Sequence, residues 1–67
     1  MTGRVFVVGG WAAFQQWNKD NPDLRGAAVH VTRDESYLGH DGVGVVLLHD
    51  AYRFPVNMLD LQVRIRR

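Results

Sequence analysis

The apolar positions of the chain fall into three short runs that each predict a β-strand. In residues 3–10 (GRVFVVGG), the run from Val5 to Val8 is β-branched or aromatic on both faces, as in a strand covered on both sides, and two glycines end the run. Residues 27–32 (AAVHVT) alternate between apolar and more polar positions, which indicates a half-buried strand at an edge of the sheet. Residues 43–48 (VGVVLL) form the most apolar segment, although Gly44 weakens it as a strand.

An amphipathic helix is predicted directly after the first strand. In residues 11–21, Trp11, Phe14 and Trp17 recur at three-residue spacing and share one apolar face. The Asn-Pro step at 21–22 ends this helix, because the residue before a proline is disfavoured in helical conformation.

A second helix is predicted over residues 54–67, where apolar positions again share a face. Its start is open between Pro55 in the first turn and Asn57 as the N-cap. Residues 33–42, which lie between the second and third strands, are polar and predict a loop with a helical turn around Glu35–Leu38.

The order β-α-β-loop-β-α predicts a small α/β fold with a mainly parallel three-stranded sheet, a minimal Rossmann-like or P-loop-like topology. The order of the strands in the sheet stays open. With the third strand central, its apolarity is explained within one chain. With the first strand central, an apolar strand lies at an edge, and a second copy of the chain could cover it.

The length of the chain allows one domain, residues 1–67, with a small core. Hydrophobic residues make up 46% of the sequence, which excludes the disordered class, and the chain has no cysteine for a disulfide or a thiolate metal site. No apolar run approaches the roughly 20 residues that span a bilayer, and residues 1–10 lack a signal-peptide core. We therefore expect a cytoplasmic protein without membrane contact.

The net charge of +1 conceals an uneven distribution. Residues 1–33 carry four cationic side chains against two carboxylates, residues 34–52 carry four carboxylates and no lysine or arginine, and residues 53–67 carry four arginines against one carboxylate. An acidic middle and a basic end favour self-association or a charged partner over a nucleic-acid footprint.

The Gly9-Gly10 turn lies where nucleotide-binding proteins hold phosphate. It lacks the third glycine of G-x-G-x-x-G and the lysine and hydroxyl residue of a P-loop, so we expect a structural turn and no cofactor. Parallel sheets nevertheless bind ligands beyond the carboxyl ends of their strands. The residues predicted at this edge are Gly9, Gly10, Thr32, Arg33, His49, Asp50, Tyr52 and Arg53. The weak anion-site candidates among them are Gly9, Gly10, Arg33, Asp50 and Arg53.

Catalytic chemistry has little support in the sequence. There is no G-x-S-x-G elbow and no cysteine nucleophile, so we name no catalytic residue and expect no enzyme. The pairs His40-Asp41 and His49-Asp50 precede and follow the third strand, so roughly 20–30 Å of extended chain separates them. No metal site is therefore expected within one chain, and a site shared across an oligomer stays open. His30 is expected to be a partly buried strand histidine.

Large and charged side chains of the two helices supply the interface candidates. These are Trp11, Trp17, Phe54, Met58 and Arg64. Arg64, Arg66 and Arg67 could also contact nucleic acid, but no recognition motif accompanies them, so nucleic-acid binding is the less favoured alternative.

The layout resembles a broad group of small actinobacteriophage proteins of unassigned function. The matching features are F-x-x-W at 14–17, AVHVT at 28–32 and YLG at 37–39, followed by an apolar third strand and an arginine-containing final helix. The resemblance implies a phage-encoded accessory protein in the bacterial cytoplasm, and it supplies no catalytic residues. We expect a homo-oligomer that acts through protein contacts, binds a host protein and perturbs host growth. An anion- or nucleotide-binding module is the alternative.

Overall fold

The computed structural model describes residues 3–65. Three strands and two α-helices follow one another in the order β-α-β-β-α, as the apolar pattern predicts. They are β1 (Val5–Val8), α1 (Trp11–Asp20), β2 (Ala28–Val31), β3 (Gly44–Leu47) and α2 (Met58–Val63). Three single-turn 3-10 helices connect them, namely η1 (Arg25–Ala27), η2 (Asp34–Ser36) and η3 (Ala51–Arg53).

The sheet is parallel throughout, with the strand order β2-β1-β3. Phe6 pairs with Val29 of β2 on one side and with Val45 of β3 on the other. The small parallel α/β fold expected from the sequence is therefore confirmed. The open question of strand order is also answered, since β1 is central and the apolar β3 lies at an edge.

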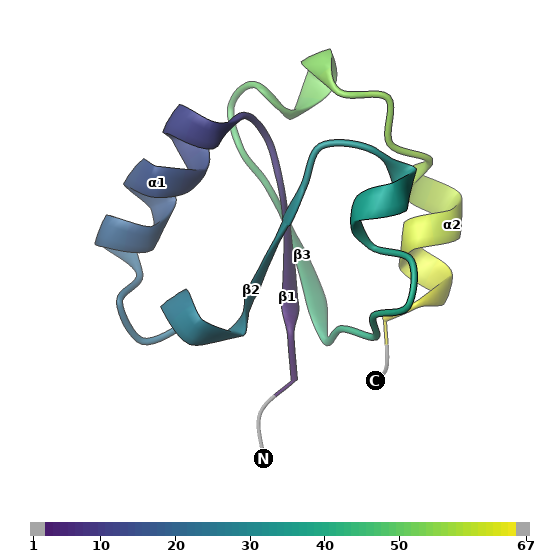
Figure 1. The fold of residues 1–67 in the computed structure, drawn as a ribbon, viewed down its shortest axis with the longest axis horizontal. Helices are drawn as coiled ribbons and strands as arrows, with labels where there is room; N and C mark the ends of the chain where they lie inside the picture. Colours follow the sequence, from purple (N-terminus) through teal and green to yellow (C-terminus); the bar gives the residue numbers. More distant parts are fainter. Residues whose placement is uncertain (1–2, 66–67) are drawn as a thin grey trace.

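The two α-helices cover opposite faces of the sheet. In Figure 1 the strands overlap in the centre of the molecule, α1 lies on their left, and η2 and α2 lie on their right. Because α1 has ten residues and α2 only six, each face is covered by one short α-helix, with the single turn η2 beside α2. Such thin cover leaves apolar side chains exposed at the margins of the sheet.

The main core lies between the sheet and α2. Its buried members are Phe6, Val8, Val29, Val31, Tyr37 and Leu61. Successive strand residues point to opposite faces, so Val7 faces α1 instead and is also fully buried. Fully burying one such side chain contributes about 1.5–3 kcal/mol. Because β1 is the central strand, its side chains are buried on both faces of the sheet, as the sequence predicts.

Local signals explain the helix limits. The backbone N–H and the side-chain Nδ2 of Asn21 both donate to the Trp17 carbonyl at 2.9 Å, which ends α1 just before Pro22. The side chain of Asn57 accepts from the Asp60 N–H at 3.2 Å, so the later of the two expected starts of α2 is the correct one. The expected span 54–67 is too long, because the helix ends at Val63.

No helix within residues 3–65 is long and apolar enough to cross a membrane.

Candidate functional site

The Gly9-Gly10 turn, which follows β1, is closed by a carboxylate that follows the neighbouring strand β3. Asp50, which follows β3, accepts from the Gly10 backbone N–H through both of its oxygens, at 3.2 and 3.1 Å. Gly10 is the N-cap residue of α1, and as a glycine it has no side chain that could accept a capping hydrogen bond. The negative charge that complements the helix dipole at the N-terminus of α1 is thus supplied by Asp50, 40 positions away in the sequence.

Close approach explains why both residues of the turn are glycines. A Cβ at Gly10 would lie 2.7 Å from Asp50 Oδ2, and a Cβ at Gly9 would lie 2.7 Å from the Leu48 side chain. These separations are shorter than van der Waals contact, so a side chain at either position would displace Asp50 or Leu48. The two glycines therefore allow Asp50 and Leu48 to pack closely against the turn.

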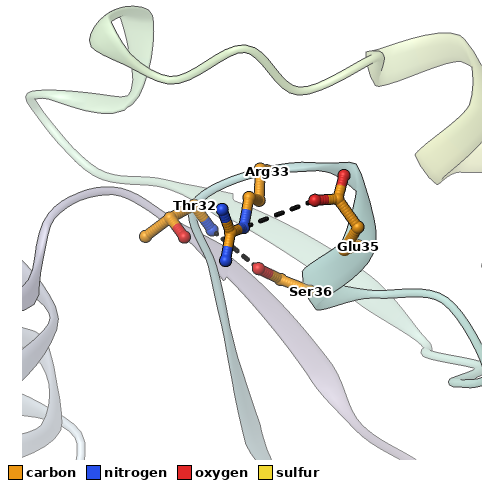
Figure 2. A network of polar contacts seen from close by, with 4 residues as sticks. All are labelled: Thr32, Arg33, Glu35 and Ser36. Atoms are coloured by element: carbon orange, nitrogen blue, oxygen red, sulfur yellow. Dashed lines mark hydrogen bonds and ion pairs between the residues drawn. The ribbon is translucent and has the colours of Figure 1, made fainter.

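The anion-site candidates do not converge on one point. Gly9, Gly10 and Asp50 lie together, but the Asp50 carboxylate lies beside the amide that a phosphate would approach. Arg33 turns instead to Glu35, and their Nε–Oε2 distance is 3.5 Å (Figure 2). Both side chains are exposed, and such ion pairs contribute about 0–1 kcal/mol.

Thr32 and Arg53, which were also expected at this edge, each make a contact close by in the sequence. The Thr32 backbone N–H donates to Ser36 Oγ at 3.3 Å, which helps to close the turn between β2 and η2 in Figure 2. The Arg53 guanidinium lies 5.9 Å from the centre of the Tyr52 ring. Each of these polar residues contacts a neighbour within four positions along the chain.

His30 is the half-buried strand histidine that the sequence predicts. Its ring stacks on Phe14, with the ring centres 4.4 Å apart and an angle of 10° between the planes. Trp11 lies against the same imidazole, with ring centres 5.6 Å apart. His30 Nε2 is 2.7 Å from the Gly9 carbonyl oxygen, so the histidine joins the glycine turn to the aromatic face of α1.

The two His-Asp pairs lie at opposite ends of β3, as expected. His40-Asp41 precedes the strand, and His49-Asp50 follows it. Within residues 3–65, no group of three or more histidine and carboxylate side chains could hold a metal ion.

An apolar groove of about 300 Å³ opens at the carboxyl end of the sheet, between β3 and α2. We call it the carboxyl-end groove; its lining includes Leu47, Ala51, Tyr52, Phe54, Val56 and Met58. Tyr52 is 81% exposed and Leu47 is 60% exposed, so two large side chains at this site face solvent. The groove offers apolar contact surface rather than a polar reaction centre.

The interface candidates occupy different surroundings. Phe54 and Met58 are half-buried and line the carboxyl-end groove. Trp11 is 62% exposed on α1, whereas Trp17 is half-buried beside a smaller pocket next to His49. Arg64 packs within the chain, with its guanidinium 5.4 Å from the centre of the Tyr37 ring. Arg66 and Arg67 lie outside the described residues.

One polar cluster was not predicted from the sequence. The hydroxyl of Tyr37, a fully buried residue, lies 3.0 Å from Asp34 Oδ1 and 2.8 Å from Asp60 Oδ2, and both carboxylates can accept its hydrogen. Burial and then the hydrogen bonds to Asp60 and Asp34 raise the pKa of Tyr37 above its ordinary value. The sequence feature that could have indicated this cluster is an aromatic residue inside the polar segment 33–42. Asp34 also accepts from the Asn57 N–H at 2.8 Å, so this cluster ties η2 to the start of α2.

Comparison with known proteins finds no match to a protein-family model, a curated protein or a solved structure.

Proposed function

We propose that the protein is a protein-binding module that acts through apolar contacts, both with copies of itself and with another protein. The observation that carries the proposal is the carboxyl-end groove, with Tyr52 and Leu47 exposed at it. Exposed apolar surface of this kind marks interaction sites in small proteins. Tyrosine and arginine are enriched among the residues that dominate binding energy, and Arg53 lies over the Tyr52 ring.

The occupant that fits this groove is an aliphatic or aromatic side chain of a partner protein. The lining is apolar, and the guanidinium of the neighbouring Arg53 lies over the Tyr52 ring. The resemblance to small actinobacteriophage proteins makes a bacterial host protein the proposed partner. In that setting the chain is an accessory protein of the bacterial cytoplasm whose contact with the host factor perturbs growth.

Nucleotide or anion binding is the alternative, and the geometry supports it less well. Gly10 N–H, which lies at the turn where a phosphate would have to bind, already donates to the Asp50 carboxylate. Nucleic-acid binding through the final arginines has less support as well, because Arg64 packs against Tyr37.

The test compares three forms of the full chain as bait in a bacterial lysate: wild type, Tyr52→Ser and Val63→Ser. Val63 is 82% exposed on α2 and does not line the groove, so it is the matched control. A host protein that wild type and the Val63 variant retain, and that the Tyr52 variant loses at least about tenfold, supports the proposal. The purified pair should then bind in calorimetric titration.

Equal recovery by all three forms contradicts a role for the groove. Titration with ATP, NAD and duplex DNA covers the alternatives. Saturable nucleotide binding that Gly10→Asp abolishes favours an anion-binding module, and salt-dependent DNA binding favours a nucleic-acid function.

A further inference from the structure

A cation lies at the wall of the carboxyl-end groove. The Arg53 guanidinium is 5.9 Å from the centre of the Tyr52 ring, and Tyr52 lines the groove. Phe54, which follows Arg53 in the sequence, lines the groove as well. Arg53 and Tyr52 are both exposed, so this charge lies where the apolar surface meets solvent. A ligand that enters the groove therefore meets a cation beside apolar side chains.

The carboxylates nearest to Arg53 in the sequence are engaged elsewhere. Asp50 accepts from the glycine turn with both of its oxygens, and Asp60 accepts from a buried tyrosine hydroxyl at 2.8 Å. Among residues 3–65 an ion pair joins Arg33 to Glu35, and none involves Arg53. The positive charge of Arg53 is thus available to a carboxylate that a ligand brings.

The contact with Tyr52 suits Arg53 to this task. A cation over the face of an aromatic ring is held by electrostatic attraction, which does not use the N–H groups of the guanidinium. Those N–H groups form a planar fork that matches the two oxygens of a carboxylate. The ring therefore positions the cation beside the groove while its hydrogen-bond donors stay available.

We propose that the carboxyl-end groove binds an acidic-apolar segment of a partner protein, with an aliphatic or aromatic side chain in the groove and a neighbouring carboxylate paired with Arg53. This rests on the proposed function and adds the charge of its partner. An extended chain advances about 3.3 Å per residue. The 5.9 Å between the Tyr52 ring and the guanidinium therefore places the carboxylate one or two residues from the apolar side chain. Aspartate, glutamate or a chain-terminal carboxylate fits this position.

The same cation discriminates between partners. An apolar segment flanked by lysine or arginine would bring a second positive charge against Arg53, and like charges at an interface disfavour binding. A neutral segment would make the apolar contacts alone. The carboxylate of an acidic segment approaches Arg53 rather than the Gly10 N–H, so this contact differs from phosphate binding at the glycine turn. Apolar contact thus provides most of the affinity, and Arg53 provides selectivity.

Two small probes isolate the contribution of the carboxylate. N-acetylphenylalanine carries a phenyl ring and a carboxylate, whereas N-acetylphenylalaninamide carries the same ring and no charge. Titration of the full chain with each probe is followed by NMR, through the amide shifts of groove residues such as Ala51 and Met58. Ligands of this size should have dissociation constants of about 1 mM. The acid should bind the wild type about threefold more tightly than the amide, as expected for an exposed ion pair.

Three variants assign the preference to Arg53. Arg53→Gln should abolish the difference between the two probes and leave the affinity for the amide unchanged, so the amide also reports that the variant is folded. Arg33→Gln is the matched control, because it removes another exposed arginine, the one that pairs with Glu35, and it should keep the preference. Tyr52→Ser removes an aromatic wall of the groove and should weaken both probes.

Equal affinity of the wild type for both probes, or a preference that survives in Arg53→Gln, overturns the carboxylate contact and leaves the apolar groove of the proposed function standing. Groove shifts that appear on dilution without a probe would show that a second copy occupies the groove, and they also overturn the inference. So does the absence of groove shifts with either probe. The lysate comparison of wild type with Tyr52→Ser then decides the proposed function by itself.

Discussion

Asp50 and Gly10 are joined across the top of the sheet, where both carboxylate oxygens accept from one backbone N–H at 3.2 and 3.1 Å. This contact connects the segment after β3 to the start of α1. It also puts the protein's own carboxylate beside the glycine turn.

Removing this carboxylate should destabilise the fold. Asp50→Ala should lower the free energy of unfolding by about 1–2 kcal/mol, the usual effect of losing a helix cap or a hydrogen bond to a charged group. Asp50→Asn keeps an acceptor and should lose less. Urea denaturation followed by circular dichroism measures both, with the exposed Asp23→Ala as control. An unchanged midpoint in Asp50→Ala would show that the contact contributes nothing to stability.

The aromatic residues of α1 should differ in their contribution to stability. The aromatic spacing places Trp11, Phe14 and Trp17 on one apolar face, but Trp17 is half-buried, whereas Phe14 is 9% exposed and stacks on His30. Phe14→Ala should therefore cost about 3–5 kcal/mol and approach the whole stability of so small a domain. Trp17→Ala should cost less, because part of its surface already contacts water. Denaturant melts that show the reverse order would contradict this assignment of the core.

Tyr37 should make the stability of the protein depend on alkaline pH. Its pKa is raised in the folded state by burial and by the hydrogen bonds to Asp60 and Asp34. The stabilisation is complete below the unfolded-state pKa of about 10, and it is lost as pH rises toward the higher folded-state pKa. Unfolding free energy should therefore fall above about pH 10, with a slope of up to about 1.4 kcal/mol per pH unit from this group.

Denaturant melts of wild type and Tyr37→Phe between neutral and alkaline pH separate this effect from other titrations. The Phe variant should lose the slope that Tyr37 supplies, whereas Tyr52→Phe, which keeps the buried tyrosine, should retain it. Identical pH profiles for wild type and Tyr37→Phe would contradict the role of the buried hydroxyl.

The sequence predicts the features of this fold that depend on the local periodicity of apolar residues. The apolar run at 5–8, the alternation at 28–31 and the aromatic spacing of α1 each identify an element with small errors at its ends. The length of α2 is overestimated because apolar residues continue to Ile65, although the helix ends at Val63. Periodicity reports which residues share a face, but it does not report where a helix loses its hydrogen bonds.

Contacts between distant segments could not be predicted in this way. Asp50 reaches Gly10 across 40 positions, and Asp60 reaches Tyr37 across 23. Neither pair leaves a periodic signal, because each depends on how β1, β3 and α2 are placed in space. Strand order has the same limitation, since an apolar strand is equally consistent with the centre of a sheet and with an edge that a second chain covers.

Self-association is tested most directly by light scattering after size exclusion, on the wild-type chain over a range of concentrations and at two salt concentrations. We expect a mass that rises toward two chains at high micromolar concentration. Because apolar burial should dominate and exposed ion pairs contribute only about 0–1 kcal/mol each, moderate salt should leave the dimer intact. A monodisperse monomer at every concentration would contradict self-association.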